Sequence, residues 1–357
     1  MEERYADRGK LIKVSLIITI IASVLSFSVM IAYAAQKTII ISEEAKEEDS
    51  ELYGYDDLYW DIDTKNLTDS KINVLKVFIP SDSSISDVSM GVRYDQKTVS
   101  IRIKNTRASS FLSEPPRGNY EHVTAARGVY DQKDTTIIFE LDEPCVCDMT
   151  PKGRVLELRF TPVSEIEGPI VMIDAGHGGY QTGTRVGNVT EKNVTLSLAM
   201  TVQELCKNKP YTVLLTRQDD VFLGVTERVM SIEAVGADYF VGIHLSTDVE
   251  DTKKFGMSAF YNPLYYHNGL ENAEFADILL KKAATAASDR ALGVFEAGED
   301  EAALRVLDIP SAYLYAGYIS NTDEARLLGD YDYIKKIAEG IVEALDTVIV
   351  PEGDLEQ

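Results

Sequence analysis

The sequence predicts an α/β domain with a mainly parallel twisted sheet and helices on both faces, preceded by a small all-β domain and an N-terminal transmembrane helix. Three patterns predict this fold class. Strand-like and helix-like segments alternate from residue 169 onward, short segments rich in Val, Ile and Phe fill residues 72–161, and residues 14–35 carry no charge. The 357 residues suffice for two domains with appendages, at about 100–200 residues per domain.

The N-terminal run VSLIITIIASVLSFSVMIAYAA at residues 14–35 is 22 residues long. About 20 apolar residues span a bilayer as a helix, whereas a secretory signal has an apolar region of about 7–15 residues. The length therefore favours a retained anchor. Basic residues precede the run and mostly acidic residues follow it, so the positive-inside rule places the following domains outside the cytoplasm. Ala32 and Ala34 also fit a small-x-small cleavage pattern, so secretion after signal cleavage stays open.

The charge pattern and the segment pattern together divide the chain. The acidic stretch EEAKEEDSE at 43–51 has little to bury and predicts a solvated linker. We expect a cytoplasmic N-terminus at 1–13, the anchor or signal peptide at 14–35 and the linker at 36–68. A small β-sandwich-like domain should follow at 69–165, then the α/β domain at 166–350 and a tail at 351–357.

Short strand-like segments separated by turn residues predict the β domain, at 73–79, 98–103, 136–141 and 155–160. In the α/β domain the expected strands are 170–173, 211–215, 239–243 and 312–318, and the expected helices are 194–206, 225–235, 274–287 and 333–345. Such alternation is typical of a parallel sheet covered on both faces, in which sites form at the carboxyl ends of the strands.

Composition excludes some classes of partner. The formal net charge is −23, from 35 Lys and Arg against 58 Asp and Glu, whereas a nucleic-acid-binding surface is basic. The sequence therefore predicts no nucleic-acid partner. The three cysteines, Cys145, Cys147 and Cys206, are too few and too odd in number for a disulfide framework, and we interpret them as packing residues.

Three residues at strand exits and a helix start form the candidate site. His177 lies in DAGHGG at 174–179, directly after the first expected strand. Glu191 begins a helical run, and the preceding Thr190 is a residue type that suits an N-cap. His244 directly follows the expected strand at 239–243. Each alone is compatible with a structural role. Together, two imidazoles and one carboxylate are a donor set that binds catalytic zinc and leaves a fourth position for water.

Five separated motifs then carry a family resemblance: IVMIDAGHGG at 170–179, TEKNVTL at 190–196, LTRQDDVF at 215–222 with Glu227 and Arg228, ADYFVGIH at 237–244, and IPSAYLYAGYISN at 309–321. In this order and spacing, residues 169–350 resemble the zinc-dependent N-acetylmuramoyl-L-alanine amidases. The resemblance implies zinc as cofactor, with His177, Glu191 and His244 as its ligands. It also implies peptidoglycan as substrate, cleaved between N-acetylmuramic acid and the L-alanine of the stem peptide.

One position departs from the family pattern. The family carries a catalytic glutamate on its closing strand, and alignment of Pro310 and Gly317 with that pattern puts Tyr315 there. Tyrosine, with an ordinary pKa of about 10, does not serve as a base near neutral pH. Two functions therefore stay open. One is a working hydrolase with a relocated base, for which Glu296, Glu299 and Asp308 are candidates. The other is a zinc-retaining pseudo-amidase that binds peptidoglycan or regulates a partner hydrolase at the membrane.

Overall fold

The structure is a computed structural model in which residues 58–64, 74–81, 83–131, 133–263, 266–267 and 270–350 are described. The expected cytoplasmic N-terminus, the transmembrane helix at 14–35, most of the linker at 36–68 and the tail at 351–357 lie outside these residues. No helix within the described ranges has the length and apolar character needed to cross a membrane.

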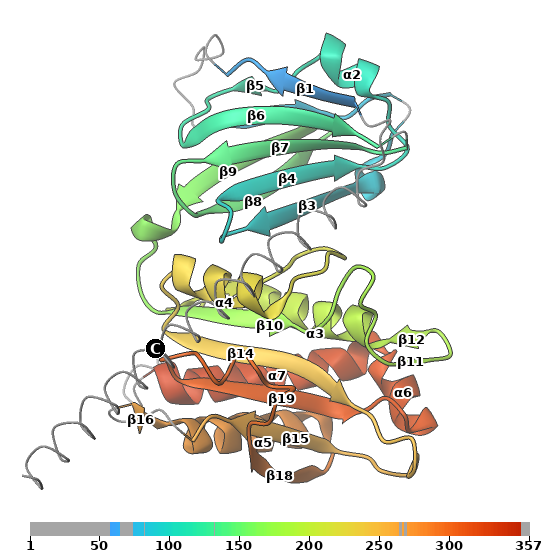
Figure 1. The fold of residues 1–357 in the computed structure, drawn as a ribbon, viewed down its shortest axis with the longest axis vertical. Helices are drawn as coiled ribbons and strands as arrows, with labels where there is room; N and C mark the ends of the chain where they lie inside the picture. Colours follow the sequence, from blue (N-terminus) through green and yellow to red (C-terminus); the bar gives the residue numbers. More distant parts are fainter. Residues whose placement is uncertain are drawn as a thin grey trace, which may run out of the picture. The chain divides into compact units, whose positions relative to one another are not determined.

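Residues 58–162 contain two antiparallel sheets (Figure 1). The first has five strands in the order β1 (Leu58–Ile62), β6 (Val123–Tyr130), β7 (Thr135–Leu141), β4 (Thr98–Ile103) and β3 (Val88–Arg93). The second has the order β5-β2-β9-β8, which are Arg117–Gly118, Leu75–Phe78, Val155–Pro162 and Cys145–Lys152. Buried and less buried residues alternate along β7, as expected for a strand with one face in a core. Phe139 and Phe160 meet edge to face between the sheets, with ring centroids 5.9 Å apart.

This region differs from the expectation in two places. Strand β1 lies inside the range 36–68 that the sequence predicted as linker, and it pairs with β6 along its whole length. A six-residue helix, α2 (Ala108–Ser113), interrupts the succession of strands, and two short 3-10 turns lie at Ile85–Asp87 and Val163–Glu165. Cys145, Cys147 and Cys206 are all buried and unbridged, as the packing interpretation predicted.

The α/β region is built on a six-stranded sheet in the order β13-β10-β14-β19-β15-β18. The strands are Thr212–Leu215, Ile170–Ala175, Tyr239–Ser246, Ser311–Tyr318, Met257–Tyr261 and Ala291–Glu296. All neighbours are parallel except β15 and β19, which run antiparallel. The sheet is thus mixed, and its β15 and β18 strands were not predicted.

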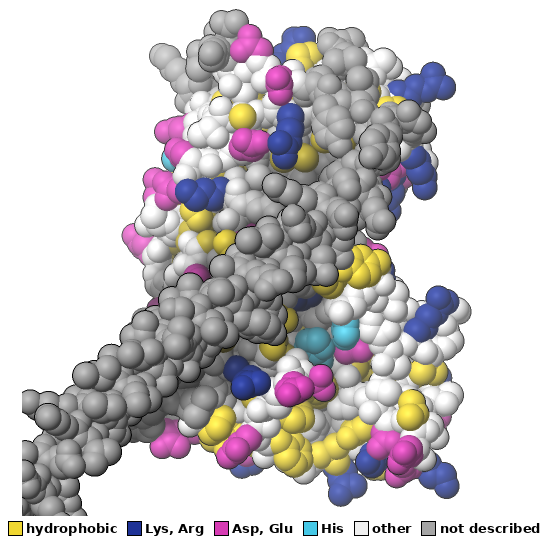
Figure 2. Space-filling model, viewed as in Figure 1, with side chains coloured by type: hydrophobic (Ala, Val, Ile, Leu, Met, Phe, Trp, Pro, Cys, Tyr) yellow, Lys and Arg dark blue, Asp and Glu magenta, His cyan; other side chains and the backbone are white. Residues whose placement is uncertain are grey.

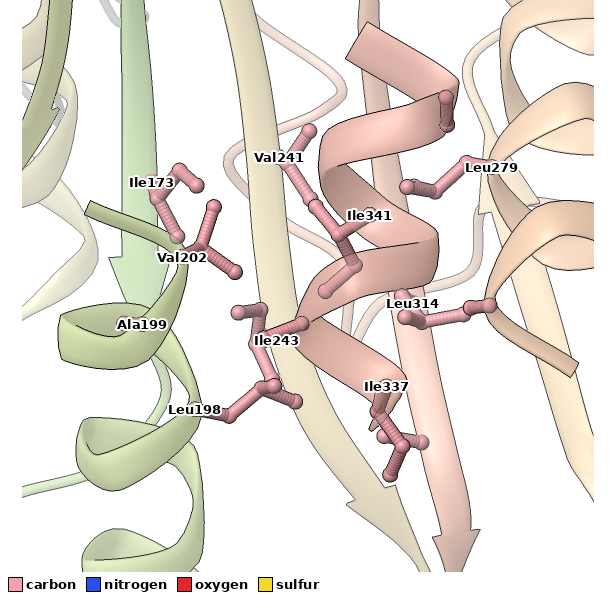
Figure 3. Packing of buried hydrophobic residues seen from close by; sticks show 14 of the residues in the cluster. Ile173, Leu198, Ala199, Val202, Val241, Ile243, Leu279, Leu314, Ile337 and Ile341 are labelled. Carbon is pink, nitrogen blue, oxygen red and sulfur yellow. The ribbon is translucent and has the colours of Figure 1, made fainter. Parts of the chain in front are cut away.

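One face of this sheet packs against four helices: α3 (Glu191–Leu205), α5 (Asn272–Ala287), α6 (Thr322–Leu328) and α7 (Tyr331–Ile349). Figure 3 shows the centre of that layer, where Ile173, Val241 and Leu314 of the sheet meet side chains of α3, α5 and α7. The opposite face packs against α4 (Val225–Ala234) and against apolar residues of the segment after β18. Helices therefore cover both faces, as predicted. Two-residue strands form the small hairpins β11–β12 (Arg185–Val186, Val189–Thr190) and β16–β17 (Tyr266–His267, Leu270–Glu271).

Helix α7 illustrates why the layer is tight. Its buried positions recur at helical spacing, from Ile334 through Ile337 and Ile341 to Leu345, and Asp330 caps its first turn by accepting from two backbone N–H groups. A Cβ on Gly340 would lie 2.6 Å from the backbone of Ala283, so only glycine lets α5 and α7 approach this closely. Because β10, β14 and β19 are parallel, their carboxyl ends meet at one edge of the sheet, where the candidate residues lie.

Candidate metal centre

His177 follows the carboxyl end of β10 in a tight loop. Its φ is +61°, a left-handed conformation that non-glycine residues adopt only where the surroundings enforce it. The surroundings here include Arg228, whose guanidinium donates to the His177 carbonyl at 2.8 Å. The imidazole is 21% exposed, and its Nε2 lies 3.1 Å from Oε1 of Glu191. The loop therefore presents one ring nitrogen toward the start of α3.

Glu191 is the first residue of α3, as expected, but its neighbour Thr190 makes no side-chain capping bond. Both Glu191 oxygens accept backbone N–H groups instead: Oε2 from Thr184 at 3.0 Å and Oε1 from Leu245 at 2.9 Å. Burial raises the pKa of the Glu191 carboxyl, but hydrogen bonds and charge interactions with the two histidines outweigh burial and hold this pKa well below its usual value. The carboxylate is thus ionised and held in a fixed orientation.

His244 lies near the carboxyl end of β14, on the strand next to β10. Its Nδ1 is 3.5 Å from Oε1 of Glu191, and its ring meets that of His177 edge to face at 5.1 Å. Tyr313 and Tyr315 of β19 stack on the His244 ring with centroid distances of 5.3 and 5.7 Å. The aromatic neighbours leave the imidazole little rotational freedom.

The structure thus brings together all three residues that the sequence singled out. One ligand atom each from His177, Glu191 and His244 lies within 4.8 Å of the others. The space around them is shaped by glycines: a Cβ on Gly176 would lie 2.4 Å from the His244 ring, and a Cβ on Gly183 would lie 2.6 Å from Oε2 of Glu191. Two imidazoles and one carboxylate in a cradle of this kind fit a zinc ion.

Buried arginines hold the loop that carries His177. Arg217 donates to the carbonyls of Ala175 and Gly176, both at 2.9 Å, and Arg228 donates to Ala175 at 2.9 Å and forms an ion pair with the buried Asp174. Burial raises the pKa of the Asp174 carboxyl, but Arg228 reverses this effect and lowers it. The sequence offered these arginines only as parts of motifs. Their role as loop supports became visible from their contacts.

Tyr315 occupies the place where the resemblance expects a glutamate. It pairs in register with His244 across β14 and β19, and its hydroxyl donates to Oε1 of Glu301 at 2.7 Å. Burial and this hydrogen bond raise the pKa of Tyr315, so the hydroxyl stays protonated. Sequence reasoning missed Glu301.

The three carboxylates that the sequence proposed as substitutes, Glu296, Glu299 and Asp308, are exposed. Glu301 is 4% exposed. The sequence around Glu301 carries no distinctive pattern, because the apolar Val306 in the same stretch is exposed while Glu301 is buried.

A cavity joins these groups. The cavity is lined by residues from the His177 loop, the start of α3, the ends of β14 and β19, strands β15 and β18 and the segment after β18. The lining residues include His177, Glu191, His244, Tyr315 and Glu301. Figure 2 shows histidine side chains at this surface with acidic and hydrophobic side chains beside them. The arrangement offers a candidate metal centre in the wall of a cleft lined by both polar and apolar residues, which suits a ligand larger than an ion.

Comparison with known proteins agrees with the geometry. A family model described as N-acetylmuramoyl-L-alanine amidase matches residues 171–347. The uncharacterized protein YqiI of Bacillus subtilis is 31% identical over 196 residues, which are 54% of this chain and 92% of that protein. The germination-specific N-acetylmuramoyl-L-alanine amidase of Bacillus subtilis is 27% identical over 205 residues, 53% of this chain and 83% of that enzyme. The catalytic domain of the amidase CwlV from Bacillus (Paenibacillus) polymyxa var. colistinus is 30% identical, with a TM-score of 0.45 over 50% of this chain and 97% of that domain. By its match to the family model and to the sequence relatives, the chain belongs to the N-acetylmuramoyl-L-alanine amidase family.

Proposed function

We propose that this chain hydrolyses the amide bond between N-acetylmuramic acid and the L-alanine of the peptidoglycan stem peptide, and that it does so with zinc held by His177, Glu191 and His244. The observation that carries the proposal is the convergence of these three side chains within a region that matches the amidase family model. Their donor set is the one that proteins use for catalytic zinc with an open position.

The chain's own residues have definable tasks in this reaction. A bound zinc ion would polarise the scissile carbonyl and acidify a water molecule. The backbone donors of Thr184 and Leu245 fix the Glu191 carboxylate, and Tyr313 and Tyr315 fix the His244 ring, so the ligands need not reorganise. The cleft beside the three residues is the place that we assign to the peptidoglycan strand. A group that takes a proton from the attacking water and returns it to the leaving amine is also required, and the family's usual glutamate is replaced by Tyr315.

That replacement favours a second candidate function. A zinc-retaining pseudo-amidase would bind peptidoglycan or regulate a partner hydrolase without turning over its ligand. Both candidates place the α/β domain outside the cytoplasmic membrane, and we propose that residues 14–35 anchor it there. Secretion after signal cleavage is the alternative for location.

Incubation of the full chain with purified peptidoglycan separates the candidates. The hydrolase releases stem peptides with a free L-alanine amino group, detected by N-terminal labelling and mass spectrometry, and release stops when a chelator removes the metal. Bound zinc and sedimentation with peptidoglycan without release indicate the pseudo-amidase. A chain that binds neither zinc nor peptidoglycan contradicts both.

A further inference from the structure

Glu301 is a buried carboxylate without an ion-pair partner in the described part of the chain. It is 4% exposed, and it forms no ion pair with any Lys, Arg or His among the described residues. Burying an unpaired carboxylate is unfavourable unless hydrogen bonds satisfy it. Within the described residues, the donors to Glu301 are the Tyr315 hydroxyl to Oε1 and the Gly298 N–H to Oε2, both at 2.7 Å. A carboxylate has about four acceptor positions, so Glu301 keeps acceptor capacity toward the cavity it lines.

The segment after β18 holds Glu301 in place. Ala303, Leu304 and Leu307 of this segment are buried in the apolar layer over the sheet. Asn262 anchors the segment by donating to the Leu304 carbonyl at 2.6 Å. The position of Glu301 is thus set by packing and by a backbone contact, in contrast to the exposed neighbour Glu299.

Tyr315 connects Glu301 to the metal centre. Its ring stacks on His244, and its hydroxyl, at the far end of the same ring, donates to the Glu301 carboxylate. Tyr315 therefore occupies the β19 position where the family has its glutamate. Its hydroxyl, at the far end of the ring, holds the Glu301 carboxylate by a hydrogen bond. The same cavity contains the three clustered residues, Tyr315 and Glu301.

We propose that Glu301 is a catalytic residue of this amidase, the relocated carboxylate that replaces the missing glutamate of β19, and that Tyr315 is its positioning residue; the proposal rests on the proposed function. Glu301 accepts a proton from the water as the water oxygen bonds to the scissile carbonyl carbon. It returns that proton to the nitrogen as the C–N bond breaks. The products are the lactyl carboxylic acid and a stem peptide with a free amine, so no further reactant is needed.

Glu301→Gln in the full, zinc-loaded chain tests the proposal. Loss of a general base lowers kcat by about 10²–10⁴-fold. The expected result is such a loss with zinc affinity and KM for peptidoglycan unchanged. Glu299→Gln is the matched control, since it removes a nearby exposed carboxylate and should leave kcat unchanged. Wild-type turnover in Glu301→Gln would overturn the proposal and leave the amidase function standing, whereas an inactive wild-type chain would overturn both.

A second substitution separates a catalytic role from a structural one. Adding Tyr315→Glu to Glu301→Gln puts a carboxylate back at the family position. Recovery of turnover in this double variant supports the proposal, because a purely structural loss at Glu301 is not repaired from β19. Absence of recovery assigns Glu301 to structure and overturns the proposal.

A measurement on the metal-free chain needs no turnover at all. Thermal denaturation of Tyr315→Phe, Glu301→Gln and their combination reports the coupling between hydroxyl and carboxylate. The expected Tm loss of the combination is smaller than the summed losses of the single variants, since each removes the same hydrogen bond. Additive losses would show that the contact does not hold Glu301 and would overturn the positioning role of Tyr315.

Discussion

Gly183 makes the proposed metal centre sensitive to a single methyl group. Gly183→Ala would place a Cβ 2.6 Å from Oε2 of Glu191 and 2.7 Å from the His177 ring, whereas ordinary contact begins at 3.4 Å. To restore a 3.4 Å contact, the Glu191 carboxylate must give way by about 0.8 Å and the His177 ring by about 0.7 Å. Metal–ligand distances tolerate only about ±0.2 Å. We expect zinc affinity to fall by about 10–100-fold, the range seen when groups supporting metal ligands are altered, which corresponds to about 1.4–2.7 kcal/mol.

Gly187 provides the matched control for this change. It has φ +58°, against +63° at Gly183, and a Cβ on it meets nothing within 4 Å. Alanine at either position incurs the left-handed backbone strain of about 1–2 kcal/mol, but only Gly183→Ala disturbs the ligands. Competition with a chromogenic chelator measures zinc affinity, and thermal denaturation without metal measures the shared strain. Equal zinc affinities for the two variants would show that the close contacts at Gly183 do not set the positions of His177 and Glu191.

Three further changes test the electrostatics and packing. Burial, together with nearby Asp289, raises the pKa of Glu324 to about 7 against backbone hydrogen bonds that lower it. The folded chain therefore keeps a proton that the unfolded chain loses near its ordinary value of 4.5, and stability falls as pH rises from there toward 7. Glu324→Gln should lessen the fall in Tm between pH 5 and 8. Thr216→Val removes a 2.5 Å hydrogen bond to the buried Asp174 and should destabilise by about 1.5–3 kcal/mol in urea denaturation. Leu279→Ala, at a fully buried position of α5, should cost about 2–5 kcal/mol.

Each of these expectations has a contradicting outcome. A Glu324→Gln variant whose Tm follows the wild-type pH curve would show that this carboxyl titrates normally in the fold. A Thr216→Val variant as stable as the wild type would mean that Asp174 is satisfied by its other partner alone. The control for Leu279→Ala is Leu327→Ala on α6, which is 43% exposed and should change stability by less than about 0.5 kcal/mol.

The sequence predicted the parts of the fold that have strong local periodicity. Strands β10, β14 and β19 and helices α3, α5 and α7 were recognisable because they are continuously apolar or carry apolar residues at helical spacing. Strands β15 and β18 were missed, since neither Met257–Tyr261 nor Ala291–Glu296 is continuously apolar and no residue of β18 is buried. The antiparallel direction of β15 follows from where the chain returns to the sheet, which local pattern does not encode.

The candidate site was accessible from sequence only in part. His177, Glu191 and His244 stood out because strand exits and a helix start place such side chains at one edge of a parallel sheet. Glu301 did not, because its burial depends on how the segment after β18 folds back over β19, a long-range contact. The expected side-chain cap of Thr190 is absent, and the first N–H groups of α3, those of Glu191 and Lys192, donate instead to the carbonyls of Thr184 and Thr182.

Zinc K-edge absorption spectroscopy on the zinc-loaded full chain reports directly whether His177, Glu191 and His244 bind the metal. We expect a first shell of nitrogen and oxygen at about 2.0–2.2 Å, including two imidazoles, and its loss in His177→Ala and His244→Ala. A shell containing sulfur at about 2.3 Å, which would place the metal on cysteine, or a shell unchanged by both substitutions, would contradict it.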